Sequence, residues 1–115
     1  MRIEVIDSAV PLEHLRQIAE GGFGTMVKAV IDVDRGIMAV GGELHADEEA
    51  ILLEQGSEQR DLWGINIYPE LAKEERVEFD SMINIRPTQG NRSRGVEHPA
   101  TRAHILRIVE DLVRE

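Results

Sequence analysis

Hydrophobic residues recur at every second position in some stretches of the chain and at every third or fourth position in others. The alternating stretches, each of which predicts a β-strand, are residues 2–6, 26–33, 37–40, 62–68 and 77–86. Between the second and third of them, Asp34, Arg35 and Gly36 predict a hairpin turn, because glycine readily adopts a positive φ.

Helical spacing marks three further segments. Pro11 suits the first turn of a helix whose apolar stripe ends at Gly21. Residues 46–55 predict a second helix, with acidic residues in its first turn and Gly56 just past its end. A third helix is predicted to begin near Pro99 and to continue to the end of the sequence.

These elements follow one another in the order β-α-β-β-α-β-β-α, in which hairpins outnumber crossover units. The pattern predicts an α+β fold, a single globular domain over 1–115, with a mostly antiparallel sheet of about five strands and three helices on one face. The stretches 62–68 and 77–86 are expected to pair. Their apolar sets meet only if paired residue numbers have an even sum, for example 146, which brings Asn66 near Asp80.

A sheet covered on one face leaves the other face to solvent or to a partner. That second face is expected to be mixed, either ordinary solvated surface or the polar floor of a pocket or dimer contact. Val30 and Met82 on it favour a homodimer. Trp63 is expected in the core rather than on a binding platform, with Gly64 permitting close packing beside it.

The charge balance narrows the choice of partners. The chain has 22 acidic and 13 basic residues and a formal net charge of -9, which repels polyanions, so no nucleic-acid partner is expected. Charges alternate at the start of the sequence, and no apolar span approaches the roughly 20 residues of a membrane helix, so neither a secretion signal nor a membrane partner is expected. The absence of cysteine agrees with a reducing compartment, and we expect a cytoplasmic protein.

An arginine-rich segment, "IRPTQGNRSRGVEHP", stands out in this acidic chain. Its turns expose backbone N–H groups beside guanidinium groups, which predicts a site for a small phosphorylated or carboxylated ligand. The candidate ligand-binding residues are Arg86, Asn91, Arg92, Ser93 and Arg94. The alternative is that these arginines pair with the protein's own carboxylates and fix a long loop.

A second candidate segment, "GGELHADEEA", contains Glu43, His45 and Asp47. Its spacing matches no metal-binding pattern, and acidic residues in a first helical turn are explained by the helix dipole, so no metal is expected. His45 and Asp47 remain possible acid or base groups. The sequence contains no dinucleotide, phosphate-loop or serine-triad motif, and no cofactor is predicted.

The stretches "GIMAVGGELHADEEAILLEQGSEQRDLWGINIYPE" and "EFDSMINIRPTQGNRSRGVE" resemble a family of small bacterial proteins classified as a domain of unknown function. The resemblance covers nearly the whole chain and implies no activity, ligand or site residue. Three classes of function therefore stay open. The residues favour a binding module for a small anionic ligand, and the alternatives are a homodimeric interaction protein with structural arginines and a small enzyme that uses His45 and nearby carboxylates.

Overall fold

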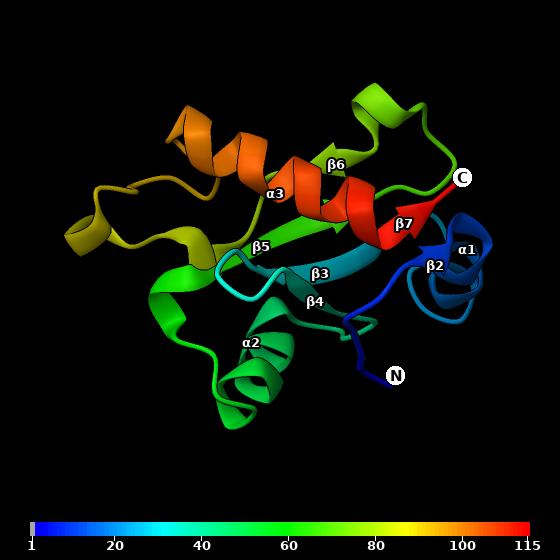
Figure 1. Ribbon diagram of the computed structural model, residues 1–115, viewed down its shortest axis with the longest axis horizontal. Helices are drawn as coiled ribbons and strands as arrows, with labels where there is room; N and C mark the ends of the chain where they lie inside the picture. Colours follow the sequence, from blue (N-terminus) through cyan, green and yellow to red (C-terminus); the bar gives the residue numbers. More distant parts are fainter. Residues whose placement is uncertain (1) are drawn as a thin grey trace.

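The computed structural model describes residues 2–115 and has an α+β architecture with three α-helices (Figure 1). The helices are α1 (Leu12–Glu20), α2 (His45–Glu54) and α3 (Pro99–Leu112). The main sheet is antiparallel, has the strand order β1-β4-β3-β5-β6, and consists of β1 (Glu4–Ile6), β3 (Val27–Asp32), β4 (Ile37–Val40), β5 (Leu62–Ile67) and β6 (Val77–Glu78). A short parallel pair joins β2 (Val10–Pro11) to β7 (Val113–Arg114). Short 3-10 turns are η1 (Gln59–Asp61), η2 (Lys73–Glu75), η3 (Met82–Asn84) and η4 (Pro87–Gln89).

The predicted fold class is confirmed, and the β3–β4 hairpin is the clearest example of local sequence acting as expected. Gly36 has a φ of 68° in the turn. The Asp32 carboxylate accepts hydrogen bonds from the backbone N–H groups of Asp34 and Arg35 and from the Ser57 hydroxyl at 2.6 Å. These bonds fix the turn and connect it to the segment after α2.

The prediction that all helices cover one face of the sheet is wrong. Figure 1 shows α3 crossing one side of the sheet and α2 lying on the other side. One core cluster joins α1 and α3 to residues such as Ala29 and Ile31, while a second joins Leu52 of α2 to Val30 and Leu62. Almost every residue of the central strands β3, β4 and β5 is buried, as expected for a sheet covered on both sides. Val30 is fully buried and is therefore not available for a dimer contact.

The predicted long strand over 77–86 is also wrong, because only β6 forms. It pairs Asn66 with Glu78, a register two residues from the expected one that keeps the same faces together. Beyond Glu78 the backbone groups of Gly64 in β5 bind the Asn84 side chain instead of a neighbouring strand. Asn84 Oδ1 accepts from Gly64 N at 2.8 Å, and Asn84 Nδ2 donates to Gly64 O at 2.9 Å. Asp80 still lies near Asn66, as predicted, with the Asn66 Nδ2 3.4 Å from the Asp80 carbonyl oxygen.

Candidate functional site

Chemically diverse side chains gather around a cavity of about 520 Å³ between the start of α2, the strands β3 and β5, and the segment that follows β6. Its polar lining comes from five parts of the chain and comprises Lys28, His45, Asn66, Tyr68, Glu78, Asp80, Ser81 and Arg94. Lys28 and Asn66 are paired residues on neighbouring strands, so they face the cavity side by side. Apolar side chains complete the wall, namely Met26, Leu44, Ala46, Met82 and Ile83.

His45 is held as a neutral imidazole with a defined tautomer. Its Nε2 lies 2.7 Å from the carbonyl oxygen of Ile65, and because a carbonyl only accepts hydrogen bonds, Nε2 carries the proton. Burial lowers the pKa of His45, and the positive charges of Lys28 and Arg94 lower it further, against the opposing effects of the Ile65 hydrogen bond and Asp80. Nδ1 makes no hydrogen bond to the described residues, so its lone pair is free.

Asn66, Tyr68 and Glu78 form a hydrogen-bonded group on one wall. Glu78 Oε1 accepts from Asn66 Nδ2 at 2.8 Å and from the Tyr68 hydroxyl at 3.2 Å. Burial and the Glu78 carboxylate raise the pKa of Tyr68, which keeps its hydroxyl protonated as a donor. Both groups near Asn66 Nδ2 are acceptors, which fixes the amide orientation and leaves the buried Oδ1 without a partner among residues 2–115.

Two cationic side chains reach the same cavity with donors to spare. Arg94 uses Nε to bind Asp80 Oδ1 at 2.6 Å, and its two terminal nitrogens make no hydrogen bond to the described part of the chain. Lys28 Nζ lies 5.5 Å from the centre of the Phe23 ring and has no carboxylate within 4.0 Å among residues 2–115. These donors are free to bind an anionic group.

Arg86 and Asn91, both predicted as ligand-binding residues, are buried and serve the loop itself. Arg86 lies 4.0 Å from the centre of the Trp63 ring and donates to the carbonyl oxygens of Gln59 and Leu62, the latter at 2.6 Å. The Asn91 Nδ2 donates to three backbone carbonyl oxygens: those of Asn84 at 2.7 Å, Gly95 at 2.8 Å and Ser93 at 3.2 Å. Asn91 Oδ1 also accepts from the backbone N–H of Glu97. The partners of Arg86 are thus backbone carbonyls rather than the carboxylates considered as the alternative.

The backbone N–H groups of Arg92 and Ser93 converge on a single oxygen, as an anion-binding turn requires. That oxygen is Glu97 Oε2, at 2.7 Å from Arg92 N and 2.8 Å from Ser93 N. These hydrogen bonds, the one from Arg92 first, hold the pKa of Glu97 below its usual range. The amides expected to face an external anion therefore bind a carboxylate of the protein, and Arg92 itself is exposed.

Of the predicted site residues, the structure brings together His45 and Arg94. Asp47 is exposed and does not line the cavity. Lys28 and Tyr68 were not among the predicted site residues. Their signal in the sequence is that they alternate with the buried apolar residues of their strands and so lie on the mixed second face of the sheet. Within residues 2–115 no three His, Asp or Glu side chains are grouped so as to hold a metal ion, and no helix there is long and apolar enough to span a membrane.

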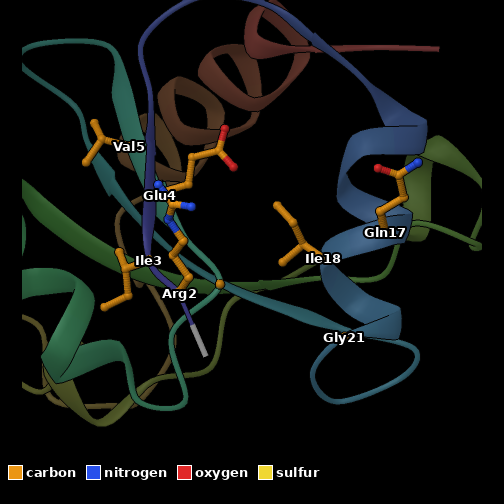
Figure 2. A pocket seen from close by; sticks show the side chains of 8 residues that line it. Arg2, Ile3, Glu4, Val5, Gln17, Ile18 and Gly21 are labelled. Carbon is orange, nitrogen blue, oxygen red and sulfur yellow. The ribbon is translucent and has the colours of Figure 1, made fainter.

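A larger hollow of about 710 Å³ lies between β1 and the C-terminal half of α1 (Figure 2). Figure 2 shows Ile18 directed from α1 toward β1, whereas Ile3 and Val5 are directed to the other side of the strand. The Glu4 carboxylate in its wall is already bound to His14 Nε2 at 2.8 Å. Besides Glu4, the polar side chains that line this hollow are Arg2 and Gln17, so it has fewer polar groups than the cavity beside His45.

The molecule is thus a small α+β protein with a polar cavity on the α2 side of its sheet. The chain belongs to the family described as "Protein of unknown function (DUF5674)", which matches residues 4–112. No curated protein and no solved structure matches the chain with significant similarity.

Proposed function

We propose that the protein binds a small carboxylated or phosphorylated ligand in the cavity lined by Lys28, His45 and Arg94. The observation that carries this proposal is the convergence of two cationic side chains with unused donors on one hollow of suitable size. The terminal nitrogens of Arg94 can present two parallel N–H donors to a carboxylate or phosphate, and Lys28 adds a positive charge. The neutral His45 places a further polar group at the same wall.

The local charge favours a monoanion. Lys28 and Arg94 are balanced by Glu78 and Asp80 in the same lining, so the cavity is close to neutral on a molecule of net charge -9. Glu78 accepts hydrogen bonds from the neutral donors of Asn66 and Tyr68 and therefore keeps its charge, whereas Asp80 is paired with Arg94. A dianionic phosphate meets both carboxylates with twice the charge of a carboxylate, so a single carboxylate fits this electrostatic environment better.

Thermal unfolding in sodium acetate and in sodium phosphate, each compared with sodium chloride at equal ionic strength, tests the proposal. A ligand that binds only the folded state at roughly 100 times its dissociation constant adds about 2.7 kcal/mol to the free energy of unfolding. For a domain of this size that raises Tm by about ten degrees. We expect acetate to raise Tm beyond chloride. At the same ligand concentration we expect phosphate to raise Tm less than acetate, because the carboxylates of the cavity lower the affinity for a dianion.

Two arginines of the same loop supply matched variants. Arg94→Gln removes the donors that line the cavity, whereas Arg92→Gln removes an exposed guanidinium outside it. We expect the acetate effect to disappear in Arg94→Gln and to persist in Arg92→Gln. A wild-type protein that responds to acetate and phosphate no more than to chloride would overturn the proposal, and loss of the effect in Arg92→Gln alone would move the site away from the cavity.

A second candidate function is a small enzyme that uses His45. The free Nδ1 lone pair and the lowered pKa of this imidazole favour a general base. His45→Gln keeps an N–H donor for the Ile65 carbonyl and removes the base. A bound ligand that is converted over time by the wild type and stays unchanged with His45→Gln would support catalysis in place of binding alone.

The homodimer stays a prediction with a smaller basis. Val30 lies under α2, so of the two residues on which it rested only Met82, which is 65% exposed, is at the surface. The Met82 side chain borders the cavity, and a second copy seated there would compete with a ligand.

A further inference from the structure

The two most exposed large apolar side chains of residues 2–115 border the same cavity. Met82 is 65% exposed and Leu44 is 59% exposed, ahead of Phe23 at 45%. Leu44 directly precedes α2 and Met82 begins η3, so the two come from different elements that meet at the cavity. Single exposed apolar residues need no explanation, but two that flank one polar hollow form a continuous surface with it.

That apolar surface continues into the cavity. Met26 and Ile83 are partly buried, and both line its wall together with Leu44 and Met82. The cationic donors, by contrast, come from Lys28 and Arg94 in the same lining. An occupant that complements this wall therefore has an anionic end and an apolar body.

We propose that the ligand of this cavity is an amphipathic monocarboxylic acid, whose carboxylate binds Arg94 and Lys28 and whose hydrocarbon portion covers Leu44 and Met82. This proposal rests on the function proposed above and specifies the class of ligand. Thioether and leucine side chains adapt to apolar groups of different shape, so the hydrocarbon portion contributes affinity while the guanidinium sets orientation. The volume of about 520 Å³ is in the range of small-molecule sites.

Charge complementarity favours a small acid over a second copy of the chain as the occupant. Each copy carries a net charge of -9, and the cavity already contains Glu78 and Asp80. A symmetric contact would bring the same carboxylates of two copies together, whereas a monocarboxylate brings a single charge to the free end of Arg94.

A chain-length series of straight-chain acids tests the inference. Dissociation constants for acetate, butyrate, hexanoate and octanoate are measured by amide chemical-shift titration, below the concentration at which the acids form micelles. Affinity is expected to rise with each added methylene that leaves water, by up to about fourfold. 1-Hexanol is the control for nonspecific apolar binding, because it has as many carbon atoms as hexanoate and no charge, and it is expected to bind the cavity much more weakly than hexanoate.

Substitutions at the rim show whether the chain lies where proposed. Leu44→Gln and Met82→Gln are expected to abolish most of the gain from acetate to hexanoate. Leu53→Gln is the matched control, because Leu53 is an exposed leucine of α2 that does not line the cavity, and it is expected to leave the gain unchanged. All three side chains are exposed, so these variants are expected to fold.

The outcomes separate the two proposals. Acetate binding that depends on Arg94 with no gain along the series would overturn the amphipathic ligand and leave the anion site intact, whereas no binding of any acid would overturn both. Equal effects of the Leu44, Met82 and Leu53 variants on the gain from acetate to hexanoate would also overturn the amphipathic ligand. So would a solution mass twice 12.9 kDa that returns to the monomer value in Leu44→Gln, since a second copy would then cover the rim.

Discussion

At the scale of single residues, Glu48 differs most from the expectation of a solvated acid in the first turn of a helix. Its side chain is fully buried, and its Oε2 accepts from Gly42 N at 2.9 Å. Its Oε1 has no partner among the described residues. Burial raises the pKa of Glu48 from its ordinary value of 4.5 to about 9, so the folded protein holds this carboxyl protonated at neutral pH.

The raised pKa predicts a pH-dependent stability that Glu48→Gln removes. Between pH 4.5 and 9 the folded state binds one proton more at this site than the unfolded state, so the free energy of unfolding falls as pH rises. The decrease is up to about 1.4 kcal/mol per pH unit. We expect urea unfolding, followed by Trp63 fluorescence, to show Glu48→Gln gaining stability relative to wild type from pH 5.5 to pH 8.5.

Glu54→Gln on the exposed part of α2 is the control for the loss of one acidic residue, and its difference from wild type is expected to stay constant over this range. His45 is present in all three proteins, so its own titration cancels. Parallel pH profiles for wild type and Glu48→Gln would contradict a protonated Glu48.

The acidic first turn of α2 shows why the sequence could not supply this detail. Asp47, Glu48 and Glu49 all suit the positive end of a helix dipole, and that interpretation treats them as equivalent. Which of them turns inward depends on the position of Gly42, where an added Cβ would lie 2.9 Å from Glu48 Cγ. That contact joins two segments that meet only in the folded chain.

At the scale of elements, strands and helices with a clear period were predicted well, and the segment after β6 was not. The alternation of Val77, Phe79, Ser81 and Ile83 fits a strand. The segment nevertheless turns away, because Ser81 packs into the space left by Gly64 and Asn84 satisfies the Gly64 backbone groups. Alternation reports which side chains are apolar and does not report which backbone groups find side-chain partners. The same turn places Asp80 and Met82 at the cavity, on the sheet face that the sequence analysis considered as the polar floor of a pocket.

The close contact between Gly64 of β5 and Ser81, which directly precedes η3, predicts that one added methyl group at position 64 destabilises the fold. A Cβ at position 64 would lie 2.5 Å from both Cβ and Oγ of Ser81 and 3.2 Å from His45 Cδ2, so Gly64→Ala forces these side chains apart. We expect a loss of roughly 1–3 kcal/mol in the free energy of unfolding. Chemical denaturation measures it, and the His45 ring resonances are expected to shift.

Ser81→Gly in the Gly64→Ala background removes the obstructing side chain and is expected to restore part of the loss, which makes the two effects non-additive. Gly95→Ala is the control, since its Cβ would meet its nearest neighbour at an ordinary 3.5 Å. Purely additive effects at positions 64 and 81 would show that the close packing does not limit stability.

At the scale of the whole molecule, acidic residues exceed basic ones by nine, and the described ion pairs are all at least partly exposed. Pairs such as Arg16–Glu70 and Lys73–Glu110 contribute little each, because water and salt screen them. The excess charge acts in the opposite direction, since folding brings the unpaired carboxylates closer together. The predicted anion site therefore lies on a surface that repels anions, which the compensating cations of the cavity must overcome.

This balance predicts that sodium chloride stabilises the protein. Raising the salt concentration shortens the Debye length from about 30 Å at 0.01 M to about 8 Å at 0.15 M, which weakens the repulsion among carboxylates more than it weakens the few close pairs. We expect Tm to increase by about 4 °C, equivalent to roughly 1 kcal/mol for a domain of this size. Reversing two exposed charges of η2, Glu74→Lys and Glu75→Lys, changes the net charge from -9 to -5, since each reversal adds two, and should reduce the salt effect. A Tm that falls with sodium chloride would show that the surface ion pairs outweigh the repulsion, and the chloride reference for the acetate experiment would then itself be destabilising.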